Sequence, residues 1–284
     1  IINLNIKYYT INIYIRMETK KDLKKDLKEK IKKRKERKQR KQRKQRKQRK
    51  NNLTILNSIK TNYLSWFLLF ICIIIISFPN LSIGFATFFV LLFSAYFWHA
   101  MSHVNKYISI IHHYHHEHNN FFSHFSQMLI ELSMGAGPFF AHQLGYKCFD
   151  PFIVIFFTLF YTTIHNINYG TLHVNQVHRE HHEELFCNLG PDICDVAFQT
   201  KSERDQDVEN TDHYIPNIIF ITIFVLILQY VCKYDCVYNC LIYFGNISYI
   251  LIGLFLGIST AYLTMESLGY IDYIYEKIYE KIYD

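Results

Sequence analysis

Long apolar segments after residue 60 are the feature that most constrains how this chain can fold. A helix that crosses a bilayer perpendicularly needs about 20 consecutive apolar residues. Several of the segments are shorter than this, so some would be tilted, re-entrant or interfacial. We therefore predict an all-α integral membrane protein with four to six transmembrane or interfacial helices. The apolar segments are 63–79, 81–98, 125–141, 151–168, 217–232 and 241–263.

Positive charge is concentrated in residues 1–50, which hold 22 of the 31 Lys and Arg residues but only five of the 24 acidic residues. Such a segment cannot bury a core. It could be a nucleic-acid patch, an anchor on anionic lipid or a solvated tail. We favour the solvated tail, and no nucleic acid is expected as a partner. Basic residues that precede a first apolar segment stay in the cytosol, which predicts a cytosolic N-terminus.

All 15 histidines lie between residues 99 and 213, and the expected topology places the dense groups on one face. From a cytosolic N-terminus, the first two apolar segments form a hairpin that returns the chain to the cytosol near residue 99. A second hairpin, made of the third and fourth segments, would return it to the same face near residue 169. The sequence thus predicts a histidine-rich, metal-binding cap on the cytosolic side.

Eight of these histidines form three spaced patterns, one H-x-x-x-H and two H-x-x-H-H. Residues three and four positions apart share one face of a helix, so the patterns can direct eight imidazoles into one volume. Imidazole binds borderline metals such as iron and zinc, whereas magnesium and calcium prefer oxygen. Eight donors are too many for one ion that keeps an open position, and two ions fit the number. The predicted ligands are His99, His103, His112, His115, His116, His178, His181 and His182.

These patterns resemble the histidine boxes of the fatty acid hydroxylase superfamily, a group of integral-membrane di-iron enzymes that includes sterol desaturases. The nine-residue step from His103 to His112 is similar to that superfamily, whereas acyl-CoA desaturases place their second box several times further on. The segment SHFSQMLIEL contains His124, and relatives often have a His just before their second membrane hairpin. The resemblance runs from about Tyr96 to Lys201.

The segment DVAFQT, residues 195–200, resembles a D-x-x-F-G-T sequence that follows the last box in relatives, with Gln199 in place of Gly. Relatives also carry one or two further ligand histidines at the end of the fourth span. His165 is well placed for this role, and His173 is the nearest second candidate.

The resemblance implies a membrane-bound oxidoreductase in which two irons, rather than zinc, use O2 to hydroxylate or desaturate a lipid. The lipid would be a fatty acyl chain, a sphingolipid or a sterol. Electrons would come from a cytochrome-b-type donor and its NAD(P)H reductase, and the location would be the endoplasmic reticulum. Five acids near the boxes either orient ligand imidazoles or are solvated loop charges. They are Glu117, Glu180, Glu183, Asp192 and Asp195.

Two other interpretations remain open: a membrane metal transporter or sensor with a histidine-rich loop, and an inactive relative that only binds lipid. A transporter needs polar ligands inside its spans, and three of the apolar segments have neither His nor charge. The helical spacing of Cys232, Cys236 and Cys240 favours a buried stripe over a metal site. The predicted domains are a basic arm (1–50), a first membrane hairpin (51–95), a catalytic region (96–201), and a C-terminal hairpin with an amphipathic tail (202–284).

Overall fold

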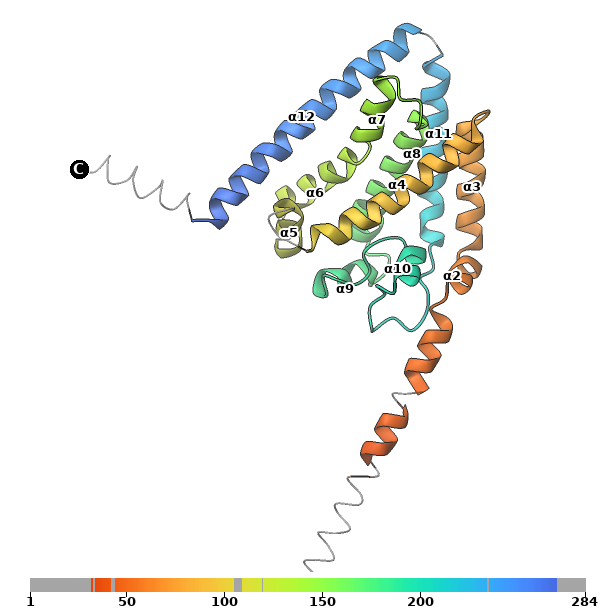
Figure 1. Ribbon diagram of the computed structural model, residues 1–284, viewed down its shortest axis with the longest axis vertical. Coiled ribbons are helices and arrows are strands. Elements are labelled where there is room, and N and C mark those ends of the chain that lie inside the picture. Colours follow the sequence, from red (N-terminus) through yellow and green to blue (C-terminus); the bar gives the residue numbers. More distant parts are fainter. Residues whose placement is uncertain are drawn as a thin grey trace, which may run out of the picture. The chain divides into compact units, whose positions relative to one another are not determined.

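The computed structural model describes residues 32, 34–41, 44–104, 109–118, 120–233 and 235–269, and the chain divides into two compact units, 1–53 and 54–284. In the first unit, residues 34–41 and 44–52 are helical and mostly exposed. The predicted amphipathic tail at the C-terminus lies outside the described residues. All regular structure in the described part of the chain is helical, which confirms the all-α prediction (Figure 1).

The second unit is a bundle of helices of unequal length (Figure 1). Its elements are α2 (Ile55–Thr61), α3 (Tyr63–Ser77), α4 (Leu81–Ser102), α5 (Ile110–Glu117), α6 (Phe121–Ser133), α7 (Ala136–Gln143), α8 (Pro151–Thr163), the π-helix η1 (Ile164–Thr171), α9 (Val177–Glu183), α10 (Asp192–Phe198), the 3-10 turn η2 (Asp212–Tyr214), α11 (Ile215–Val231) and α12 (Asp235–Ser267).

Four helical stretches are long and apolar enough to cross a membrane, and the bent pair α2–α3 would make a fifth. Four or five candidate spans lie within the predicted range of four to six transmembrane or interfacial helices. The four stretches are Leu81–Ser102, Pro151–Thr171, Asp212–Val231 and Gly245–Ser267. Apolar side chains remain exposed along two of them, including Phe220 on α11 and Ile258 on α12. Such surface requires an apolar environment or a partner.

The segment 125–141 does not form a span, contrary to its place in the predicted second hairpin. It is divided between α6 and α7, which are separated at residues 134 and 135 and contain 13 and 8 residues. Polar side chains on α6 and the glycines near the break explain this, because neither favours a continuous apolar helix. That residues 99 and 169 emerge on the same face of a membrane therefore stays a prediction. The fold does bring His99, at the end of α4, and His165, in η1, to the same cavity.

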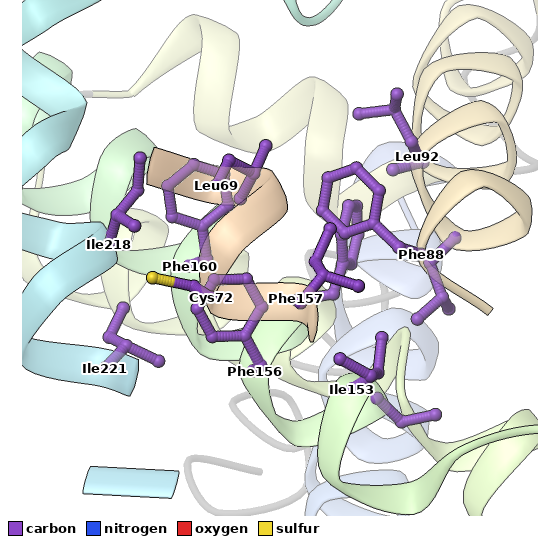
Figure 2. Packing of buried hydrophobic residues seen from close by; sticks show 14 of the residues in the cluster. Leu69, Cys72, Phe88, Leu92, Ile153, Phe156, Phe157, Phe160, Ile218 and Ile221 are labelled. Atoms are coloured by element: carbon purple, nitrogen blue, oxygen red, sulfur yellow. The ribbon is translucent and has the colours of Figure 1, made fainter. Parts of the chain in front are cut away.

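The apolar core lies between α3, α4, α8 and α11 (Figure 2). Phe88 of α4 meets Phe157 of α8 edge to face, with ring centroids 5.6 Å apart. The start of α8 is fixed by Asp150, whose carboxylate accepts hydrogen bonds from the backbone N–H groups of Phe152 and Ile153. This N-cap and Pro151 in the first turn define where the helix begins. The core thus orients α4 and α8, the two helices that continue toward the histidines.

At its end, α8 passes into η1, a π-helix of eight residues. Its wider hydrogen bonding is visible where the Leu172 N–H donates to the Ile167 carbonyl at 2.8 Å, five residues back. The π-helix is rare, and π-helical turns within α-helices are frequent at functional sites. Here the π-helix contains His165 and Asn166, which face α6.

Gly84 is a position where α3 and α4 approach too closely for a side chain. A Cβ at Gly84 would overlap the Cβ and Oγ atoms of Ser77. We expect Gly84→Ala to lower the free energy of unfolding by about 1–3 kcal/mol, because the two helices must separate. Thermal unfolding in detergent measures the effect. Gly253→Ala in α12 is the matched control, because a Cβ there meets open space, and it should leave stability unchanged or raise it. Equal melting of the two variants would contradict the close packing.

Candidate metal centre

The ends of α4, α5 and α9 lie near one another at one end of the bundle (Figure 1). Eight histidines from these three helices, including His103 at the C-cap of α4, come together there. They form two groups in which one ligand atom from every member lies within 4.8 Å of the others. The five-histidine group is His99, His103, His112, His116 and His181, and the three-histidine group is His115, His178 and His182. The structure thus brings together all eight residues of the three sequence patterns.

The nitrogen atoms of neighbouring rings are spaced as ligands of a shared ion would be. In the five-histidine group, His112 Nε2 lies 3.1 Å from His103 Nε2 and 3.2 Å from His116 Nε2. In the three-histidine group, Nε2 of His178 and Nε2 of His182 are 3.0 Å apart. Two nitrogens that bind one ion at ~2.0–2.1 Å are separated by ~3.0–3.4 Å. The spacing therefore fits metal ligation in both groups.

Hydrogen bonds on the far side of the rings orient several of these histidines. His99 Nδ1 donates to the Leu189 carbonyl at 2.5 Å, and His181 Nδ1 donates to the Cys187 carbonyl at 2.8 Å. A carbonyl can only accept, so in the neutral ring Nδ1 carries the proton and Nε2 carries the lone pair. Both Nε2 atoms are buried and have no hydrogen-bond partner among the described residues. A buried lone pair of this kind calls for a cation, and metal-binding histidines are oriented in the same way.

Burial favours the neutral imidazole, which is the form that binds metal, at the histidines outside the candidate spans. Burial, with a contribution from neighbouring imidazoles, lowers the pKa of His103 to about 4, of His112 to about 3 and of His182 to about 4. Burial also holds the pKa values of the other predicted ligands outside the candidate spans below the usual range. These are His115, His116, His178 and His181.

A polar stripe on α6 supports both groups, and it was not predicted from the sequence. Ser123 Oγ lies 3.2 Å from His115 Nδ1, and Gln127 Oε1 accepts from His112 Nδ1 at 3.0 Å. Gln127 Nε2 in turn donates to Glu131 Oε1 at 3.0 Å. The signal was the spacing of four between Ser123, Gln127 and Glu131, which places these three polar groups on one face of α6.

Glu131 is the centre of this network. Its carboxylate is buried and accepts hydrogen bonds from His165 Nδ1 and from Asn166 Nδ2 of η1. The His165 ring lies 4.4 Å, centroid to centroid, from the His178 ring. Glu131 therefore connects the five-histidine group, through Gln127, with the edge of the three-histidine group.

The segment DVAFQT, residues 195–200, fixes the backbone loop whose carbonyl orients His99. Asp195 accepts hydrogen bonds from Leu189 N at 2.8 Å, Gly190 N at 3.3 Å and Thr200 Oγ1 at 2.7 Å. These contacts hold the Leu189 peptide, whose carbonyl orients His99. Of the five nearby acids, Asp195 is thus the one with a traced connection to a predicted ligand.

The other four acids have different surroundings. Asp192 is buried and pairs with Lys201 at 3.0 Å. Glu180 is buried, and within the described part of the chain its Oε2 has no hydrogen-bond partner. Glu183 pairs with Arg204 and Glu117 is exposed, so these two are surface charges of the loop and helix end.

Gln199 is the left-handed C-cap of α10, with φ of 61°. Glycine adopts this conformation without strain, whereas in other residues it costs about 1–2 kcal/mol. We expect Gln199→Gly to raise the free energy of unfolding by about 0.5–1 kcal/mol, the lower value reflecting glycine's freedom in the unfolded chain. Thermal unfolding would show a higher midpoint. Gln199→Ala keeps the Cβ and should bring no such gain; a lower midpoint for Gln199→Gly would contradict the assignment of the cap.

The two further candidates from the sequence are placed differently. His165 lies beside the three-histidine group but outside it, bound to Glu131. His173 is exposed, with φ of 48°, and its Nδ1 lies 3.0 Å from the Tyr169 carbonyl. His113 and His118 belong to neither group, and His118 stacks on Tyr114 with ring centroids 4.1 Å apart.

Three cavities lie in or near this end of the bundle, and histidines line the first and the third of them among the described residues. The core cavity, of about 100 Å³, is lined by apolar residues such as Trp66, Phe88 and Phe157 and reaches His99 and His178. The α12 cavity, of about 450 Å³, is lined by side chains of α4, α5, α6 and α12. The histidine cavity, of about 680 Å³, is lined mainly by polar side chains, with the three-histidine group on one side.

A narrow space of about 30 Å³ shares Trp98, Ile130 and Met134 with the α12 cavity. It is also lined by His99 and His112. Apolar space thus approaches the five-histidine group from two directions, through the core cavity and past Trp98.

The chain was compared with protein-family models, curated proteins and solved structures, and none of them matches it. Its function must therefore be inferred from the site itself, which is a buried cluster of histidines that can bind metal.

Proposed function

We propose that the chain is a membrane-bound di-iron oxidoreductase that uses O2 to hydroxylate or desaturate a lipid. The observation that carries the proposal is the pair of adjacent histidine groups at the end of the candidate spans, with buried and unpartnered Nε2 atoms. The resemblance of the three boxes to the fatty acid hydroxylase superfamily supports iron over zinc. Bound iron would supply the activation of O2.

The chain's own residues would position the ions and the substrate. His99, His103, His112, His116 and His181 would hold one ion, and His115, His178 and His182 would hold the other. Ser123, Gln127, Glu131 and the Leu189 and Cys187 carbonyls keep the ligand rings in place. Such groups around the ligands strongly affect metal affinity and reactivity.

The apolar cavities would bring hydrocarbon to the histidines and exclude water. The core cavity reaches His99 and His178, one member of each group. The space beyond Trp98 reaches His99 and His112. A substrate dissolved in the bilayer could enter between the candidate spans, so a lipid suits this arrangement better than a polar metabolite. Fatty acyl, sphingolipid and sterol substrates all satisfy this requirement.

We place the histidine groups on the cytosolic side of the endoplasmic reticulum membrane, with the basic arm on the same side. The histidine cavity would then face the cytosol, where a cytochrome-b-type donor fed by NAD(P)H can approach. The domain division at residues 50, 95 and 201 is retained as part of this proposal.

A metal transporter or sensor is the second candidate. Its supporting observation is the histidine cavity, which exposes several imidazoles to solvent. Against it, His99 lies at the end of α4, and the apolar segments of α3, α4 and α11 carry no charged residue that could conduct an ion. An inactive relative that only binds lipid would also have the apolar cavities.

Metal analysis of the purified chain, together with lipid profiles of cells that do or do not express it, tests the proposal. About two irons per chain and a new hydroxylated or desaturated lipid, absent with the His181→Ala variant, would support the oxidase. One zinc or no metal would contradict it. Two bound ions without any lipid change, when iron and an electron donor are supplied, would favour the transporter or the inactive relative.

A further inference from the structure

We infer that the two histidine groups hold their ions unequally: the three-histidine group exchanges its ion through the histidine cavity, while the five-histidine group retains its ion. This inference rests on the two-ion part of the proposed function. It concerns residues around the ions and makes no use of the oxidation reaction.

Donor number is the first difference between the groups. The five-histidine group offers one nitrogen from each of five rings, and the three-histidine group offers three. Four to six ligands are usual for iron or zinc. The first group can fill these positions with protein, whereas the second must add water or another ligand. An ion with bound water can exchange ligands one at a time.

Enclosure is the second difference. Within the five-histidine group, His103, His112 and His181 are buried, with ring centroids 4.7–4.9 Å apart where His103 meets the other two. They come from three separate elements: His103 caps the C-terminus of α4, His112 is on α5 and His181 is on α9. An ion there can leave only if several buried donors separate together.

The three-histidine group lies instead at a wall of the histidine cavity. His115, His178 and His182 all line this cavity, and His116 is the one member of the five-histidine group that does so among the described residues. The cavity is about 680 Å³ in volume, and polar or charged side chains make up most of its lining. Water and a chelator can therefore reach the second ion position without opening the bundle.

The same cavity is lined by histidines that belong to neither group. His118 and His173 are exposed at its wall, and His124 lines it as well. Their imidazoles are borderline donors of the same type as the ligands. They provide intermediate contacts for an ion that passes between solvent and the three-histidine group, so the histidine cavity is an entry path for metal.

Release of ferrous iron from the full-length chain tests this inference. The chain is loaded with Fe(II) in detergent without oxygen, freed of excess metal and mixed with ferrozine, which reports released Fe(II) by its colour. We expect two phases of equal amplitude. The slow phase should be slower by roughly tenfold or more, the scale on which even one supporting group changes metal affinity.

Variants assign the phases. His178→Ala should remove the fast phase and leave the slow one, whereas His112→Ala should accelerate the slow phase. A double variant that carries both His118→Ala and His173→Asn should slow the rebinding of iron to the three-histidine group without changing the final iron content. His142→Ala on α7, whose ring contacts the Phe149 carbonyl, is the control and should change neither rate.

The outcomes separate this inference from the proposed function. Release of two irons at a single rate would overturn the inference and leave the di-iron proposal standing. Loss of the fast phase in His112→Ala rather than His178→Ala would overturn the assignment of the labile site. A chain that binds no iron would overturn both. Unchanged reloading in the His118 and His173 double variant would overturn the entry path.

Discussion

In the His178→Ala variant, the proposed di-iron function predicts the loss of one of the two ions and a fall in the rate of lipid oxidation by about 100-fold or more. The substitution leaves His115 and His182 as the only members of the three-histidine group. Two imidazoles are too few to hold an ion at a position that is accessible from the histidine cavity. Groups that merely support a ligand already change metal affinity or activity by 10–100-fold, so loss of a ligand should exceed this. Metal content per chain and product formation measure the two effects.

His173→Asn is the matched control for this experiment. His173 was a ligand candidate from the sequence, but it is exposed and lies outside both groups. Asn is chosen because it tolerates the positive φ of 48° better than Ala does. This variant should keep both ions and its oxidation rate. If His173→Asn lost an ion and His178→Ala did not, the ligand set derived from the geometry would be wrong.

In the Glu131→Ala variant, the free energy of unfolding is expected to fall by about 3 kcal/mol and the oxidation rate by 10–100-fold. The carboxylate is buried and binds His165, Asn166 and Gln127. Its removal leaves buried donors without an acceptor, and each such group costs about 1–3 kcal/mol. Gln127 then no longer holds its oxygen against His112. Thermal unfolding and product formation measure the two effects separately.

Two further variants, Glu131→Gln and Glu117→Gln, separate the effect of the Glu131 carboxylate on stability from its effect on the oxidation rate. Glu131→Gln keeps the size and one acceptor oxygen, so it should preserve more of the stability than Glu131→Ala while still lowering the rate. Glu117 is exposed at the end of α5, directly after the second histidine box. Its replacement should change neither quantity. A Glu131→Gln protein with full activity would show that the carboxylate only stabilises the fold.

The grouping of the box histidines could be predicted from the sequence because a spacing of three or four residues places side chains on one face of a helix. All eight histidines of the boxes meet in the structure, while their neighbours His113 and His118 belong to neither group. The all-α class and the four candidate spans followed in the same way from uninterrupted apolar length.

The supporting groups were harder to predict, for two reasons. The carbonyls of Leu189 and Cys187 belong to the backbone, so no residue type marks them, and only the folded loop brings them to His99 and His181. Glu131 is visible in the sequence, but its partner His165 is 34 residues away and the pairing depends on how α6 packs against η1.

The prediction of a membrane segment over 125–141 is wrong because the polar stripe of α6 interrupts its apolar surface. Ser123, Gln127 and Glu131 occupy one face of α6, and that face is turned toward the histidines. A segment that supplies buried polar groups to a metal centre has an inner surface unlike that of a lipid-exposed span.

The π-helix at the end of α8 has a consequence for how such a chain could diversify. A π-turn contains one residue more than the α-turn it replaces, so it is equivalent to a single-residue insertion within the helix. Deleting one residue from η1 would restore α-helical hydrogen bonding. It would also rotate the residues that follow the deletion relative to the apolar helix α8. An insertion or deletion in η1, rather than a substitution, could thus change the direction in which His165 and Asn166 point toward Glu131. The packing of Phe156 and Phe157 in α8 would stay the same.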